Sequence, residues 1–399
     1  MMRFPKKAFV KLLPILVGAS VGAFVYIAQN KSDEPYKRDR FSGDDLAESH
    51  LADLEHDVSF LGKEHQLDHL FNEFKEQKSR LKNLHPYITV APNNTELSFR
   101  MNPKFKFSSC PYSLQGKLQE SQWASRYYHP TIQMTMTDDN INQEEYERMK
   151  TYHMPFGFHY KNELTFDELS KTLKLFSNEE SILGFESTER PRCVSCAIVG
   201  NGGILNGSGM GKEIDNHDMI FRVNHCIRRG YERDVGTRST HYVFMDRSLI
   251  HTQQSDIPKD KGIKWIFLPC RINDYHYISE VAKGTNPKQK LKANAADIRL
   301  LHPDFVRYIH KIWMRTKSFR PSTGAMMFMT ALHSGCDSLS VYGMGFNAKY
   351  TEHYYDKTFS VYKNVKGSHD FAREIEIMKE LDKAGVIKWY KRDVPEFLS

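Results

Sequence analysis

Two histidines and a carboxylate near the carboxyl end of the chain could carry out acid–base chemistry. His353 opens the sequence His-Tyr-Tyr-Asp, and His369 follows sixteen positions later, with Glu374 beyond it. We expect His369 to begin a helix, where the positive helix terminus disfavours its protonation and leaves a neutral imidazole available as a base. A single histidine is more often a surface or capping residue. Two near the carboxyl end of an α/β sheet, where ligands gather, favour a catalytic role.

Two further segments could hold an anion. Ser322, Thr323 and Gly324 open an apolar helix, where small hydroxyl residues cap the helix and leave spare donors for a carboxylate; simple capping is the alternative. The apolar run 196–199 ends in Gly-Asn-Gly-Gly, a turn that brings backbone N–H groups close to a phosphate or nucleotide. The turn lacks the third glycine of a dinucleotide fingerprint, since Leu205 stands there. A tight turn without a ligand is therefore the alternative.

One absence bears on the reaction. The sequence contains no Walker motif and no D-x-D pair, which many nucleotide-sugar transferases use to hold a divalent cation on a diphosphate. Charge on a leaving group must then be met by helix termini, tyrosine, histidine or basic side chains. A monophosphate leaving group fits that requirement better.

The alternation of short apolar runs with helical runs predicts an α/β fold with a mostly parallel sheet. The strands and helices of this fold must position the residues named above. Short buried strands are predicted from apolar runs, and helical runs such as 322–334 lie between the last two of these strands. The helix 368–385 has an apolar stripe, Ser368 as its expected N-cap and Gly385 as its expected stop. The predicted strands are residues 196–199, 219–223, 240–245, 264–268 and 339–342.

The amino terminus predicts a membrane anchor. Residues 12–28 carry no charge, Arg3, Lys6, Lys7 and Lys11 precede them, and no acidic residue occurs before Asp33. Because positive residues stay cytoplasmic, we expect a cytoplasmic tail (1–11), a transmembrane signal anchor (12–28), a luminal stem (29–105) and a luminal catalytic domain (106–399). A cleaved signal peptide is the alternative.

The cysteines agree with a secretory compartment. All six follow the predicted anchor, and six cysteines allow fifteen pairings. Cys193 and Cys196 form a C-x-x-C, but no second pair at zinc spacing accompanies it, so structural disulfides are favoured over a metal site. Asn93 and Asn206 begin sequons and are candidate glycosylation sites.

The net charge of +7 comes mostly from the basic residues around the predicted membrane anchor. Residues 1–28 contain four basic and no acidic residues, so they supply +4 of it, and the remainder carries only +3. Apolar residues make up 40% and charged residues 26%, which is ordinary globular composition. The charge therefore gives no indication of a nucleic-acid partner.

Over residues 193–393 the chain resembles the animal sialyltransferases. CAIVGNGGILNGSGMGKEIDNHDMIFRVN is similar to their large sialylmotif, PSTGAMMFMTALHSGCDSLSVYGMGF to the small one, HYYD to the third, and HDFARE to the very small one. The GNGGILNGS variant is most similar to the α2,6-sialyltransferases that act on O-linked N-acetylgalactosamine. The resemblance implies a variant GT-A-like, Rossmann-type fold in a single-pass type II Golgi membrane protein with a luminal catalytic domain. It also implies inverting, metal-independent transfer from CMP-sialic acid.

The resemblance also assigns roles to individual residues. His369 would be the general base, and His353 would contact the CMP phosphate. The positions matched to donor binding are Asn201, Asn224, Ser322, Thr323, Gly324, Gly343 and Gly345. The disulfides matched are Cys196 with Cys336 and Cys110 with Cys193; the remaining Cys226 and Cys270 would then pair, although that bridge is not general in the family.

The expected function is sialyl transfer to the 6-hydroxyl of O-linked N-acetylgalactosamine on glycoproteins, with CMP-sialic acid as donor and no cofactor. We expect acceptor selectivity to lie in 246–260 and 273–296. The alternatives are a sialyltransferase with a galactose acceptor, a catalytically inactive nucleotide-sugar-binding module, and an NAD-dependent oxidoreductase. Both histidines are present, which disfavours an inactive module, and the broken fingerprint disfavours a nicotinamide site.

Overall fold

The computed structural model describes residues 87–89, 97–153, 155–160, 162–185, 193–285, 291–345, 347–359 and 368–392. The expected tail and anchor, and Asn93, lie outside them. Within these ranges no helix has both the length and the apolar composition that a bilayer crossing requires.

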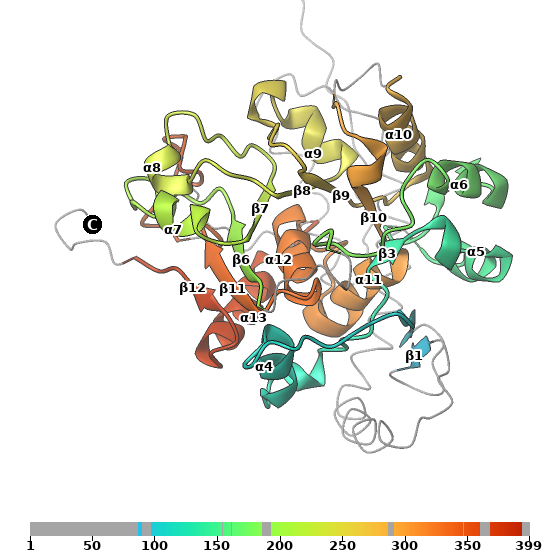
Figure 1. Cartoon of the computed structure of the whole chain (residues 1–399), viewed down its shortest axis with the longest axis horizontal. Helices are drawn as coiled ribbons and strands as arrows, with labels where there is room; N and C mark the ends of the chain where they lie inside the picture. Colours follow the sequence, from blue (N-terminus) through green and yellow to red (C-terminus); the bar gives the residue numbers. More distant parts are fainter. Residues whose placement is uncertain are drawn as a thin grey trace, which may run out of the picture. The chain divides into compact units, whose positions relative to one another are not determined.

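A mostly parallel sheet of eight strands organises the domain, in the order β12-β11-β6-β7-β8-β9-β10-β3 (Figure 1). Only β3 runs antiparallel to its neighbour β10. The predicted α/β class and the mostly parallel sheet are therefore confirmed. The strands of this sheet are β3 (Thr135–Met136), β6 (Ser195–Val199), β7 (Met219–Val223), β8 (His241–Phe244), β9 (Lys264–Phe267), β10 (Ile298–Leu301), β11 (Ser338–Tyr342) and β12 (Lys388–Trp389).

Helices connect and cover these strands. The α-helices are α4 (Leu114–Glu120), α5 (Gln143–Lys150), α6 (Phe166–Leu173), α7 (Gly211–Asp215), α8 (Glu232–Val235), α9 (Asp246–His251), α10 (Ile272–Lys283), α11 (Pro303–Tyr308), α12 (Thr323–His333) and α13 (Phe371–Lys383). A π-helical segment, η7 (Ile309–Met314), continues α11. The short 3₁₀ turns are η2 (Ala124–Arg126), η3 (Asp138–Asn140), η4 (Gly203–Leu205), η5 (Gln254–Asp256) and η6 (Ala295–Asp297).

Successive residues of β6 face opposite sides of the sheet, as the pleat requires. Cys196 and Ile198 belong to the larger hydrophobic cluster, whereas Ala197 and Val199 belong to the smaller one. Helix α12 packs against β6, β7 and β8, while α7 and α8 contribute Ile214 and Val235 to the smaller cluster. The sheet is thus covered on both faces, which explains why its central strands are mostly apolar.

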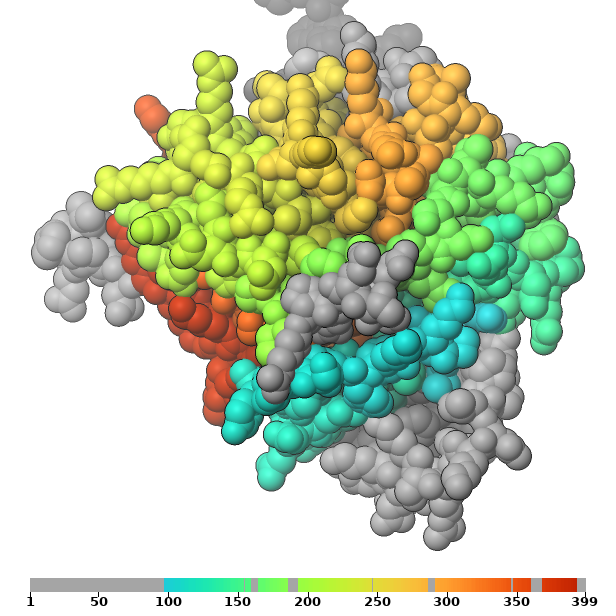
Figure 2. Space-filling view, in the orientation of Figure 1, coloured from blue at the N-terminus to red at the C-terminus, as the bar shows by residue number. Residues whose placement is uncertain are grey.

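Structure amino-terminal to the expected catalytic domain packs onto it. The strands β1 (Tyr87–Thr89) and β2 (Ser98–Arg100) pair with each other, and a second small pair is β4 (His159–Tyr160) with β5 (Asn162–Glu163). Leu97 and Phe99 are buried in the larger cluster. Figure 2 shows the segment that follows (cyan) lying across one face, between the carboxyl-terminal segment (red) and the segment of α5 and α6 (green). The boundary at 106 stays a prediction.

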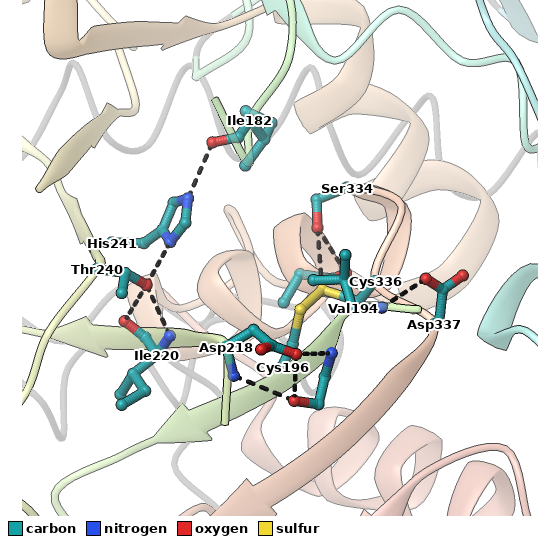
Figure 3. The surroundings of a disulfide bond; sticks show 12 residues. Ile182, Val194, Cys196, Asp218, Ile220, Thr240, His241, Ser334, Cys336 and Asp337 are labelled. Atoms are coloured by element: carbon teal, nitrogen blue, oxygen red, sulfur yellow. Dashed lines mark hydrogen bonds between the residues drawn. A yellow bond between two sulfur atoms is a disulfide. The ribbon is translucent and has the colours of Figure 1, made fainter. Parts of the chain in front are cut away.

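Two disulfides join segments that are distant in the sequence. Cys196 in β6 is bonded to Cys336, two residues before β11, and Cys110 is bonded to Cys193. Figure 3 shows the first bridge at the amino ends of these neighbouring strands, beside the hydrogen bond from the Val194 N–H to the Asp337 carboxylate at 2.7 Å. Both bridges match the pairings implied by the resemblance.

The expected third bridge is wrong. Cys226 and Cys270 are both free and buried. Cys226 follows β7 and Cys270 follows β9, and β8 lies between these strands, which puts the strand axes about 10 Å apart. A disulfide needs Cα atoms within about 7 Å. Burial raises the pKa of both thiols, that of Cys226 to about 11.

Candidate active site

The glycine-rich turn lies where the strand order reverses. After β6 the chain adds β7 to β10 on one side, and later returns to place β11 on the other side. Such a reversal opens a crevice at the carboxyl ends of the strands, where ligands bind in α/β folds. The residues 200–203 leave β6 and Gly343 leaves β11 at this point.

The two turns contact each other through their backbones. The Gly202 N–H donates to the Gly343 carbonyl at 2.9 Å, and the Gly200 N–H donates to the Tyr342 carbonyl at 2.8 Å. A Cβ at Gly200 would lie 2.4 Å from the Gly343 oxygen, and Gly343 has a φ of +61°. Glycine is therefore required by the contact between the turns. Gly345, with a φ of +86°, packs against the Trp389 ring instead.

Asn201 and Asn224 lie at the ends of neighbouring strands. The Asn201 amide donates to the Val223 carbonyl at 3.2 Å, so the two side chains follow adjacent strand ends. Asn224 has a φ of +54°, a conformation that asparagine tolerates better than most residues. Both side-chain oxygens are buried and accept no hydrogen bond from the described residues. Two such acceptors fit the amine and hydroxyl donors of a nucleoside.

Tyr354 brings His353 to the same strand ends as Asn201. The Tyr354 N–H donates to the Asn201 carbonyl at 2.9 Å, and its hydroxyl donates to the Ile227 carbonyl at 2.6 Å. The His353 Nδ1 lies 2.6 Å from the Asp356 carboxylate, and its ring stacks on Tyr355 with centroids 5.1 Å apart. Because a carboxylate can only accept, Nδ1 carries the proton and Nε2 is directed elsewhere.

His369 stands just before α13. Its Nδ1 lies 3.0 Å from the Arg320 carbonyl, which can only accept, so Nδ1 carries the proton. Nε2 has no hydrogen-bond partner among the described residues. Burial lowers the pKa of His369; the hydrogen bond to the Arg320 carbonyl acts in the opposite direction, and the positive charge of Arg320 lowers the pKa further. The ring is therefore held neutral, with the Nε2 lone pair available.

The start of α13 differs from the prediction. Its N-cap is Asp370, whose carboxylate accepts from the Arg373 N–H, and not Ser368. His369 thus precedes the helix, so burial rather than the helix dipole is the main cause of its neutral state. The predicted stop is confirmed: Gly385 has a φ of +67°, and its N–H donates to the Asp382 carbonyl at 3.0 Å.

Glu374 links the start of α12 to α13. Its carboxylate accepts from the Ser322 N–H at 2.8 Å and from the Ser322 hydroxyl at 2.7 Å. Ser322 also caps α12, since its Oγ accepts from the Ala325 N–H at 3.0 Å. Burial raises the pKa of Glu374 to about 7, although the Ser322 hydrogen bonds act in the opposite direction.

The first N–H groups of α12 are available to a ligand. The N–H groups of Thr323 and Gly324 have no acceptor among the described residues, as expected in the first turn of a helix. A Cβ at Gly324 would lie 3.3 Å from the Met344 side chain, so this turn adjoins the segment that leaves β11. The Thr323 hydroxyl lies 3.5 Å from the Met245 sulfur at the end of β8.

The structure thus brings most of the predicted site residues to one edge of the sheet. Asn201, Asn224 and His353 are connected through backbone and amide hydrogen bonds, and Ser322 is connected to the His369 segment through Glu374. Asn206 is exposed, at the end of η4. Within the described ranges no three His, Cys, Asp or Glu side chains are grouped so that they could hold a metal ion.

Sequence reasoning missed Arg320. Its backbone N–H donates to the Ser368 carbonyl at 3.1 Å, and its carbonyl accepts from His369. A basic residue two positions before a helix N-cap is unusual, because that terminus favours negative charge, and this signal could have singled it out.

Known proteins are similar to this chain in sequence and in fold. The family model for glycosyltransferase family 29 (sialyltransferase) matches residues 135–386. The chain is 33% identical over 319 residues to alpha-N-acetylgalactosaminide alpha-2,6-sialyltransferase 1 of Gallus gallus, covering 71% of this chain and 56% of that protein. It is 32% identical over 317 residues to alpha-N-acetylgalactosaminide alpha-2,6-sialyltransferase 2 of Mus musculus, covering 71% and 83%.

A solved structure agrees in fold. A crystal structure of a mammalian sialyltransferase in complex with Gal-beta-1-3GalNAc-ortho-nitrophenol superposes with a TM-score of 0.54 at 22% identity, covering 72% of this chain and all of that one. The match to the chicken protein and to its Homo sapiens counterpart spans little more than half their lengths, 56% and 53%. The family model nevertheless extends over more than half of the present chain, and so the chain belongs to glycosyltransferase family 29, the sialyltransferases.

Proposed function

We propose that this chain transfers sialic acid from CMP-sialic acid to the 6-hydroxyl of O-linked N-acetylgalactosamine on glycoproteins. The observation that carries the proposal is His369, whose Nδ1 is fixed on the Arg320 carbonyl while Nε2 has no partner among the described residues. The acceptor class is supported by the names of the relatives, which are alpha-N-acetylgalactosaminide alpha-2,6-sialyltransferases.

His369 acts as the general base in this proposal. Its Nε2 takes the proton from the acceptor hydroxyl as the acceptor oxygen forms a bond to C2 of the sialic acid. The bond from C2 to the phosphate oxygen breaks at the same time, and CMP leaves with the electron pair. Attack on the face opposite the leaving group inverts the configuration. Proton transfer to a positioned base typically contributes about 10²–10⁴-fold.

The donor is held by the residues around the two turns. The buried oxygens of Asn201 and Asn224 accept hydrogen bonds from the nucleoside, and His353 contacts the phosphate. The free N–H groups of Thr323 and Gly324 bind the carboxylate of the sialic acid, since a helix amino terminus attracts anions. Gly343 allows the turn after β6 to approach closely.

We further propose that no metal takes part and that the reaction occurs in the Golgi lumen. A monophosphate leaving group has less charge to stabilise than a diphosphate, and His353 and the helix terminus are placed to meet it. The two disulfides are compatible with a secretory compartment. The membrane anchor at 12–28, the stem and N-glycosylation of Asn93 and Asn206 belong to the same proposal.

An acceptor panel tests the function. The full-length chain is incubated with CMP-sialic acid and, separately, with a GalNAc-peptide, a Galβ1,3GalNAc-peptide and a galactose-terminated N-glycan. We expect product on the GalNAc-containing peptides, with the new linkage at the 6-position of GalNAc by mass spectrometry and NMR. Linkage to galactose would replace the proposal with the galactose-acceptor alternative, and the absence of any transfer would indicate an inactive donor-binding module.

A further inference from the structure

Arg320 stands between the candidate base and the end of β9. Its backbone is fixed by hydrogen bonds to Ser368 and His369, whereas its half-buried side chain extends to Cys270, where Nη1 lies 3.8 Å from the sulfur. A neutral thiol is a weak partner for a guanidinium, which presents five N–H donors. The guanidinium of Arg320 forms no ion pair with a carboxylate among the described residues.

Two other arginines at this edge of the sheet are paired with carboxylates. Arg228 lies 2.8 Å from the Asp260 carboxylate, and Arg271 lies 2.8 Å from the Asp274 carboxylate. Asp274 also accepts from the Cys270 N–H at 2.8 Å, so its carboxylate is occupied by groups on its own segment. Arg320 is therefore a half-buried cation beside the reaction centre whose charge the described residues leave uncompensated.

The chemistry of a guanidinium selects the ligand class. Its planar fork matches the two oxygens of a carboxylate, and a charged partner makes such bonds about twice as strong as neutral ones. Both a sialic acid already present on the glycan and an acidic side chain of the peptide carry a carboxylate.

The position of Arg320 favours the acceptor over the donor. The proposed nucleotide site is at the ends of β6 and β11, and β9 lies three strands from β6, which is about 14 Å. In the proposed function, the first turn of α12 already binds the donor carboxylate. The end of β9 leads into α10, and the end of β8 leads into α9, within the two segments from which we expect acceptor selectivity.

We propose that the Arg320 side chain binds a carboxylate on the acceptor glycopeptide and so makes this enzyme prefer acidic acceptors. The inference rests on the proposed function, because it assumes sialyl transfer to a GalNAc-peptide. It assigns Arg320 a role in specificity that is separate from the hydrogen bond of its backbone to His369.

Charge-removing and charge-conserving variants test the inference in the full-length chain. Arg320→Met and Arg320→Lys are compared with wild type and with Lys317→Met, which removes one exposed positive charge three residues away. Each is assayed on a neutral GalNAc-peptide, on the same peptide with aspartates beside the GalNAc, and on the same peptide whose glycan carries a sialic acid on galactose. KM and kcat are measured for each acceptor and for CMP-sialic acid.

We expect Arg320→Met to lower kcat/KM about 10- to 100-fold on at least one acidic acceptor, mainly through KM, and less than 3-fold on the neutral peptide. The acidic acceptor that loses rate identifies the source of the carboxylate. Arg320→Lys should recover part of the loss, and Lys317→Met should show none.

An equal loss on neutral and acidic acceptors would overturn the inference, because it would mean that Arg320 only supports His369. A raised KM for CMP-sialic acid would also overturn it, by assigning the guanidinium to the donor. If wild type transfers to none of the three peptides, the proposed function itself fails, and the inference fails with it.

Discussion

Replacing Glu374 by glutamine should stabilise the protein at neutral and alkaline pH. The carboxylate is buried, 9% exposed, and burial raises its pKa from an ordinary 4.5 to about 7. Because the folded state disfavours the charged form, this group costs no stability below pH 4.5, and the full cost is present above pH 7. The difference between the pKa values of Glu374 in the unfolded and folded states corresponds to about 3 kcal/mol of unfolding free energy.

Glutamine is the neutral analogue of this side chain. Its carbonyl can accept from the Ser322 N–H and its amide can donate to the Ser322 hydroxyl, so both contacts are retained. Glu374→Gln should therefore be more stable than wild type by about 1 kcal/mol at pH 5 and by about 3 kcal/mol at pH 8. Transfer activity should remain within a few-fold, because the start of α12 stays in place.

Urea unfolding followed by tryptophan fluorescence at pH 5 and pH 8 measures the difference. Glu374→Ala is the matched control: it also removes the charge, but it leaves the Ser322 N–H without its acceptor, at a cost of about 1–3 kcal/mol. It should be less stable than Glu374→Gln at both pH values. If Glu374→Gln is less stable than wild type at pH 8, the ionised carboxylate is net favourable in the folded protein and the reasoning is refuted.

Four further outcomes are expected. His369→Ala should reduce transfer at least 10²-fold while CMP affinity, measured by calorimetry, changes little; a tenth of wild-type turnover would contradict the base assignment. Cys336→Ser should lose about 2–4 kcal/mol of stability and much of the secreted yield, because the bridge from Cys336 to Cys196 closes a loop with a sequence separation of 140. A variant with wild-type yield would show that folding does not need this bridge. Alkylation under denaturing, non-reducing conditions should label Cys226 and Cys270, and any other pair of labelled cysteines would contradict the disulfide pattern. EDTA should leave the initial rate unchanged, and a loss that Mg²⁺ or Mn²⁺ restores would show that a metal takes part.

The sequence predicted the centre of the sheet better than its edges. The strands β6, β7 and β11 are buried over almost their whole length, so they appear as largely apolar runs bounded by turns, although β7 contains the buried Arg222. β10 was missed because it has only four residues and Arg299 leaves three of them apolar, one fewer than in β7. The Arg299 side chain is nevertheless buried, and its N–H groups donate to the carbonyls of Ser181 and Ala296. β12 has only two residues, Lys388 and Trp389, and no periodicity can indicate so short a strand.

The start of α13 shows how tertiary contacts override a local signal. Ser368 and Asp370 are both good N-cap residues, and the sequence alone does not choose between them. In the folded chain Ser368 accepts from the Arg320 N–H and His369 donates to the Arg320 carbonyl, which holds this segment against residue 320. The helix can then begin only after Asp370. The error in the predicted Cys226–Cys270 bridge has a similar origin, since strand order was not known.

The contacts between the starts of α12 and α13 connect the proposed donor-binding groups to the proposed base. The segment before α12 supplies the carbonyl of Arg320 that orients His369, while α13 supplies the carboxylate of Glu374 that holds Ser322 at the start of α12. Each helix therefore fixes a residue that belongs to the other. A displacement of either helix would move both the N–H groups proposed to bind the donor carboxylate and the imidazole proposed to take the acceptor proton. Variants that break only one of these two contacts should for that reason alter donor KM and kcat together, whereas loss of the His369 ring alone should alter kcat.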